Sequence, residues 1–94
     1  MSRKEFEELE CKLLQETEVL RTLRSEYERA HNIYLSELAA DCERSEGSGR
    51  QEALRESRQN KLSDDEFYAE RALNSQRKIV AALTLQYNNA LEQL

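Results

Sequence analysis

The sequence predicts an all-α fold: an antiparallel, coiled-coil-like helical hairpin, which we expect to assemble into a larger helical bundle. Apolar residues recur at spacings of three and four in both halves of the chain, as in helices that pack along a heptad seam. The chain has no proline, and both of its glycines, Gly47 and Gly49, lie at its midpoint. Each glycine inside a continuous helix would cost about 1 kcal/mol relative to alanine. The glycine pair therefore predicts a reversal of the chain.

The composition predicts a thin core. The chain has 94 residues, of which 38% are hydrophobic and 35% are charged, and it has no tryptophan. A single small domain with so few apolar residues cannot build a thick globular core. Long helices that each bury one narrow stripe satisfy this composition.

The first helix is predicted over about residues 3–45. Ser2 is a candidate N-cap, because its hydroxyl can accept a hydrogen bond from a backbone amide of the first turn. Glu16 occupies the one polar position within the apolar stripe, and Leu38 and Cys42 continue the stripe at steps of four, which predicts a longer local period there. The stripe consists of Phe6, Leu9, Leu13, Leu20, Leu23, Tyr27, Ala30 and Tyr34.

The middle of the chain is predicted as a glycine turn over 46–49 and a polar segment over 50–62, either helical or a loop. Ser63 followed by Glu66 has the pattern of a capping box, which predicts a second helix over about 63–93. The alternative is one helix that runs through Ser63. The serine, followed by Asp64, Asp65 and Glu66, also matches an acidic-directed kinase site.

The second helix carries a stricter heptad stripe. Its members are Leu62, Ala69, Leu73, Gln76, Val80, Leu83, Tyr87, Ala90 and Leu94. A reversal at the glycines pairs residue i with about residue 95−i, which places Gln76 near Leu20 and Glu16 near Ile79 and Val80. The predicted intramolecular seam comprises Leu9, Leu13, Leu20, Leu23, Tyr27, Leu73, Val80, Leu83 and Tyr87.

No residue pattern predicts a catalytic, cofactor-binding or metal site. His31, the only histidine, is eleven residues from Cys42, about three helical turns away, so the two cannot share a metal within one helix. Asp41 and Glu43 flank Cys42 and disfavour a reactive thiolate. Asp64, Asp65 and Glu66 lack the spacing of a calcium loop. We therefore expect a protein that is not an enzyme.

Charge and cysteine content restrict the class of partner. The formal net charge is −5, with no basic face to neutralise phosphates and no apolar run of membrane-spanning length. We expect neither nucleic-acid nor membrane binding. The first ten residues lack the apolar run of a secretory signal, and Cys11 and Cys42 are too far apart on one helix for an intrachain disulfide. These features favour a reduced, cytoplasmic protein.

Several large apolar residues do not fit on the seam and therefore predict a protein–protein interface. These interface candidates are Leu14, Val19, Ile33, Leu35, Phe67, Ile79, Leu85 and Leu91. The sequence thus predicts a non-enzymatic interaction subunit, an adaptor or structural component that forms homo- or hetero-oligomers or binds a partner helix. One alternative is a small acidic chaperone that masks an aggregation-prone helix, such as a secretion-system or assembly co-chaperone. Another is a parallel coiled-coil rod in which the glycines form only a hinge.

Overall fold

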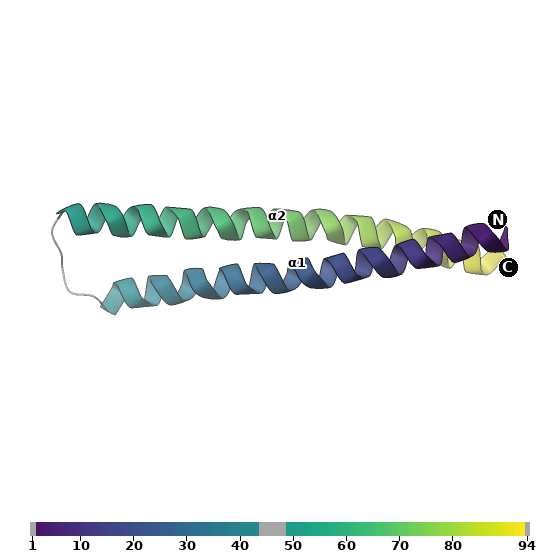
Figure 1. Ribbon diagram of the computed structural model, residues 1–94, viewed down its shortest axis with the longest axis horizontal. Coiled ribbons are helices and arrows are strands. Elements are labelled where there is room, and N and C mark those ends of the chain that lie inside the picture. The colour runs from purple at the N-terminus through teal and green to yellow at the C-terminus, as the bar shows by residue number, and fades with distance from the viewer. Residues whose placement is uncertain (1, 44–48, 94) are drawn as a thin grey trace. The chain divides into compact units, whose positions relative to one another are not determined.

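The computed structural model describes residues 2–43 and 49–93 and contains two helices, α1 (Arg3–Glu43) and α2 (Gly49–Gln93). The helices run in opposite directions (Figure 1), which confirms the predicted antiparallel helical hairpin. The alternative of a parallel rod is wrong. The predicted glycine turn lies mostly outside the described residues.

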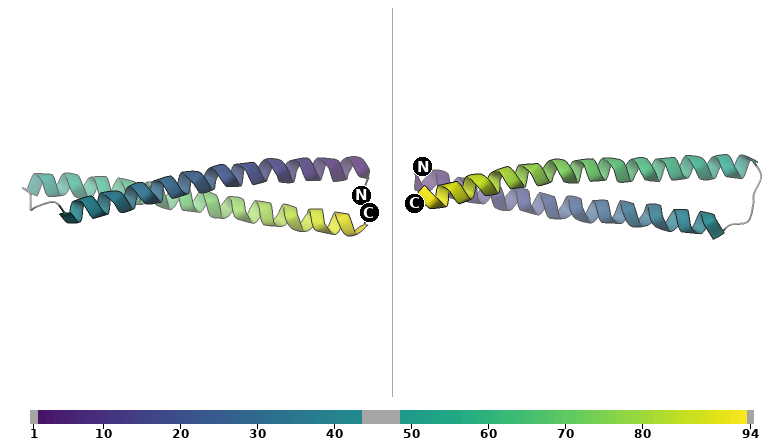
Figure 2. Two further views of the ribbon diagram at one scale, coloured as in Figure 1. Left: turned by 90° about the horizontal axis from the view of Figure 1, so that it is seen from below. Right: turned by 180° about the vertical axis from the view of Figure 1, so that it is seen from behind.

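The hairpin divides into two compact units. Unit 1 comprises residues 1–24 and 72–94, and unit 2 comprises residues 25–71. In unit 1 the start of α1 lies beside the end of α2, as Figures 1 and 2 show from three directions. In unit 2 the second half of α1 packs with the first half of α2. Each unit therefore has its own stretch of the helix–helix seam.

The beginning of α1 confirms the predicted N-cap. The Glu5 amide donates a hydrogen bond to the Ser2 hydroxyl oxygen (3.2 Å), and the Phe6 amide donates to the Ser2 carbonyl (3.0 Å). These bonds satisfy two of the amides that a helix start leaves without partners. At the other end, α1 is described as far as Glu43, so residues 44 and 45 of the predicted helix lie outside the described part.

The second helix begins earlier than its capping box predicts. Gly49, predicted as part of the turn, is the first residue of α2, and the helix continues without a break through 50–62 to Gln93. Its start near residue 63 was therefore predicted wrongly, and the alternative of a through-running helix is observed. Ser63 lies inside the helix, and the Glu66 carboxylate lies 3.2 Å from the His31 ring instead of reaching back to a cap. Good helix formers and the absence of proline explain why the polar segment stays helical.

Burial follows a strict heptad spacing along both helices. Every described residue of α2 that is not exposed falls on steps of four and three, and the same steps mark the seam of α1. On α1 this spacing continues through Glu37 and Asp41, so the predicted change to steps of four after Tyr34 is wrong. Leu38, which the prediction placed on the stripe, is half-buried next to Glu37. The side chain of Cys42 lies outside the described part. The α2 positions are Arg55, Gln59, Leu62, Glu66, Ala69, Leu73, Gln76, Val80, Leu83, Tyr87 and Ala90.

The apolar core of unit 1 is narrow. Leu73 is 1% exposed, Ala90 3% and Leu83 7%. Phe6 stacks on Tyr87 with ring centroids 5.2 Å apart, one turn from Ala90, which the sequence places opposite Phe6. A side chain in a helix–helix seam inserts between several residues of the facing helix, so one-turn offsets agree with the predicted register.

Gln76 interrupts this core with a polar contact that the sequence does not predict. Its Nε2 donates to the Glu16 carboxylate (2.6 Å) and to the Glu16 backbone carbonyl (2.9 Å), although Gln76 is only 7% exposed. Glu16 lies one turn from Leu20, the residue that the predicted register places near Gln76, so the contact agrees with that register to within one turn. A buried amide needs hydrogen-bond partners, and Glu16 on the facing helix supplies them.

We expect the Glu16–Gln76 contact to stabilise the hairpin cooperatively. A double-mutant cycle with Glu16→Ala and Gln76→Ala, followed by urea denaturation, should give a coupling free energy of about 1 kcal/mol, because each single change leaves the other polar group poorly partnered. The matched cycle with the exposed residues Glu10 and Ser75 should give a coupling near zero. Equal coupling in the two cycles would show that the contact does not contribute.

Candidate functional site

The predicted seam residues lie inside the hairpin. Leu73 and Leu83 are buried, and the other seven are half-buried. These side chains hold α1 and α2 together within each unit, so they offer little surface to a partner. The half-buried seven are Leu9, Leu13, Leu20, Leu23, Tyr27, Val80 and Tyr87.

All eight interface candidates have exposed side chains. Their exposed fractions run from 44% at Val19 to 63% at Leu14. The others are Ile33, Leu35, Phe67, Ile79, Leu85 and Leu91. The sequence-based selection missed Leu54 and Tyr68, each 63% exposed. The heptad phase of α2, counted from Leu62 back to Arg55 and forward to Ala69, places both of them off the seam.

Unit 1 presents an electrically neutral surface with exposed apolar side chains. Residues 1–24 and 72–94 contain seven Lys or Arg and seven Asp or Glu. Val19 and Ile79 each directly precede a seam residue, so in an antiparallel pair both flank the seam on the same side. Leu14, Leu85 and Leu91 are exposed elsewhere around the two helices.

Unit 2 carries the whole net charge of the protein. Residues 25–71 contain seven Lys or Arg and twelve Asp or Glu, an excess of five negative charges. Its exposed aromatic residues Phe67 and Tyr68 meet edge to face, with ring centroids 5.5 Å apart and an interplanar angle of 76°. Acidic and apolar side chains therefore share the surface of this unit.

An open depression of about 350 Å³ lies beside the seam of unit 2. It is lined by Glu26, Arg29, Ala30, Ile33, Leu62 and Asp65. Ala30 and Leu62 are half-buried seam residues, whereas Glu26, Ile33 and Asp65 are exposed. The depression thus combines apolar side chains from the seam with carboxylates on both helices.

The seam of unit 2 becomes polar toward the glycine end. Asp41 is 8% exposed, and its carboxylate accepts a hydrogen bond from Gln59 Nε2 (2.5 Å) and lies 3.6 Å from both Arg55 Nε and Arg58 Nη2. Arg58 Nε also pairs with the Glu37 carboxylate (2.8 Å). This contact set, which we name the polar seam end, replaces apolar packing with charge pairs. The sequence analysis missed it because the stripe predicted for the second helix begins at Leu62, after Arg55 and Gln59.

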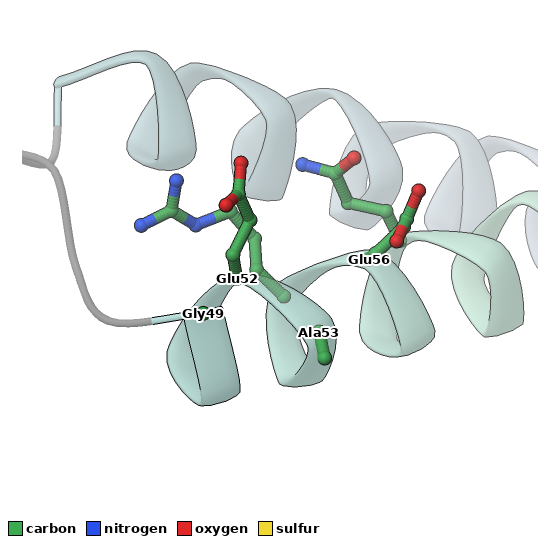
Figure 3. Close-up of a pocket in the computed structure, with 6 residues that line it drawn as sticks. Gly49, Glu52, Ala53 and Glu56 are labelled. Atoms are coloured by element: carbon green, nitrogen blue, oxygen red, sulfur yellow. The ribbon is translucent and has the colours of Figure 1, made fainter.

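A second, shallow depression lies at the start of α2 and is lined in part by Arg55 and Gln59 of the polar seam end. Figure 3 shows Glu52 and Glu56 rising from α2 on the side of α1, while Ala53 points away. Glu52 and Glu56 are exposed. Four of the six lining residues are polar or charged, so this depression offers no apolar pocket for a small ligand.

His31 takes part in packing contacts. Its ring stacks on Tyr27 with centroids 5.7 Å apart, and Nδ1 lies 3.2 Å from Glu66 Oε1. This close contact does not have the geometry of a hydrogen bond. Tyr68, which the register places near Tyr27, contacts Phe67 instead.

The structure gives three further findings on chemistry. Cys11 is an exposed free thiol. Within residues 2–43 and 49–93, no group of three His, Cys, Asp or Glu side chains could hold a metal ion. Neither helix, over its described length, contains a stretch long and apolar enough to cross a bilayer.

Comparison with protein-family models, with curated proteins and with solved structures found no significant match.

Proposed function

We propose that this protein is a non-enzymatic interaction module that uses exposed apolar side chains of a helical hairpin to associate with another helical chain. The proposal rests on ten large apolar side chains that are 44% to 63% exposed in a protein with only two helices in its described part. Single exposed apolar residues are common on soluble proteins, but so many beside a core this narrow favour a covering partner.

The partner in this proposal is a second copy of the chain or a helix of another protein. Two-helix units bury their remaining apolar faces by forming four-helix bundles. Unit 1 suits contact between copies, because it has as many basic as acidic residues and two copies would not repel one another there. An adaptor or structural component of an assembly fits this property.

A surface variant of unit 1 tests the proposal. We expect the wild-type protein to sediment as a dimer or larger assembly, or to recover a defined partner by affinity purification. The variant Leu14→Gln/Val19→Gln/Ile79→Gln/Leu85→Gln should keep its helicity and weaken that association about tenfold or more, because it removes exposed apolar area. The binding constant from sedimentation or from titration of the recovered partner provides the measurement.

The control variant Thr22→Gln/Ser75→Gln changes exposed polar residues of the same unit and should leave association unchanged. A wild-type protein that stays monomeric at all accessible concentrations and recovers no partner would contradict the proposal. So would equal weakening by the control.

A chaperone role is the alternative proposal, and the thin core favours it. Among the described residues only Leu73, Leu83 and Ala90 are buried apolar side chains. A protein with so little internal packing gains stability from a bound client helix. Under this alternative the isolated protein melts at low temperature at every concentration, and its Tm rises on addition of the client. Self-assembly instead predicts a Tm that rises with the concentration of the protein alone.

A further inference from the structure

We infer that the depression of unit 2 binds a basic amphipathic helix of another protein, with one large apolar side chain seated between Ile33 and Leu62 and lysine or arginine residues beside Glu26 and Asp65. The inference rests on the proposed function and names the chemistry of one partner. It concerns unit 2 alone.

The shape of the depression sets the apolar part of the ligand. Ala30 is a small residue at a seam position, so the surface above it and Leu62 is recessed, and Ile33, 48% exposed, forms an apolar wall. Glu26, Ile33 and Asp65 each directly precede a seam residue, which places them on the same side of the antiparallel pair. An apolar side chain of a third helix can enter such a recess as a knob enters a hole.

The charge around the depression sets the polar part of the ligand. Glu26 and Asp65 lie on opposite helices at its edge, and neither has an ion-pair partner among the described residues. Arg29 also lines the depression, yet unit 2 as a whole has five more acidic than basic residues. A second copy of this unit would bring the same excess negative charge and be repelled. The excess negative charge of unit 2 attracts a basic helix, whose lysine or arginine side chains can pair with Glu26 on α1 and Asp65 on α2.

Fluorescence anisotropy with two matched peptides tests the inference on the full chain. The basic probe is an amphipathic helix of leucine and lysine, and the acidic probe has glutamate in place of every lysine. We expect the basic probe to bind at least tenfold more tightly than the acidic one, and its affinity to fall as salt screens the charges.

Two charge-matched variants localise the site. Glu26→Gln/Asp65→Asn removes two carboxylates at the depression and should weaken binding of the basic probe about five- to tenfold. Glu28→Gln/Asp64→Asn removes two exposed carboxylates of the same unit that do not line the depression, and should change binding less than about twofold. Ile33→Asn should weaken binding about tenfold without a change in helicity, because Ile33 is already half exposed.

Two results would overturn the inference while leaving the proposed function intact. The first is equal weakening by the two double variants, which would mean that the peptide senses only the net charge of unit 2. The second is a failure of charge selection, in which the protein binds both probes equally or self-associates without binding either probe. Absence of every form of association would instead reject both proposals.

Discussion

Replacing Leu83 by Asp is expected to abolish the helical hairpin. Leu83 is 7% exposed and lies in the seam of unit 1, next in the heptad to Val80 and Tyr87. The change loses about 1.5–3 kcal/mol of apolar burial and adds the cost of placing an unpaired carboxylate in that position. The seam contains few other buried apolar residues, so the total exceeds what a small, marginally stable domain can lose.

Far-UV circular dichroism at low protein concentration measures this effect. Leu85→Asp is the matched control, because Leu85 lies two residues further along the same helix and is 62% exposed. The control should retain the helicity and the melting temperature of the wild type to within a few degrees, since exposed substitutions usually cost less than about 0.5 kcal/mol. Similar helicity in the two Asp variants would contradict the burial of Leu83.

The heptad spacing made the hairpin and its seam predictable. The period of burial in a helix depends on geometry alone, so steps of three and four identify the inner face wherever apolar residues mark it. Leu73 and Leu83 lie where this rule places them, and so do the eight outward apolar candidates. A search by spacing therefore finds which residues a helix turns outward, although it does not identify what covers them.

The hydrogen-bond partners of polar residues at seam positions were not predictable in the same way. Gln76 and Asp41 are buried because residues on the facing helix happen to carry complementary groups, and this depends on the register at single-residue precision. Arg55 and Gln59 lie in phase with Leu62, but a stripe defined by hydrophobicity ends before them. The start of the second helix was predicted at Ser63 because the capping-box pattern was given more weight than the heptad positions before it. Extending the heptad spacing back from Leu62 without regard to residue type would have indicated both the earlier helix and the seam positions of Arg55 and Gln59.

Asp41 provides the second large effect, because its carboxylate is shared by three side chains of α2. Replacing it by alanine leaves Arg55 and Gln59 without this acceptor at the polar seam end, while Arg58 keeps its ion pair with Glu37. Breaking a fully buried ion pair costs about 3–5 kcal/mol, but water reaches the side chains of Arg55 (25% exposed) and Arg58 (48% exposed). We therefore expect Asp41→Ala to lower the free energy of unfolding by about 1–3 kcal/mol.

The triple variant Asp41→Leu/Arg55→Leu/Gln59→Leu should have the opposite effect. It places apolar side chains at three heptad positions and removes the desolvation cost of the three polar groups there, so the free energy of unfolding should rise by about 1–4 kcal/mol. Urea denaturation measures both variants, and Glu28→Ala, at an exposed position of the same unit, serves as the control. A harmless Asp41→Ala together with a destabilised triple variant would show that the carboxylate is not held between the helices. A stabilised triple variant would show that the polar seam end makes unit 2 less stable than apolar packing at the same positions would.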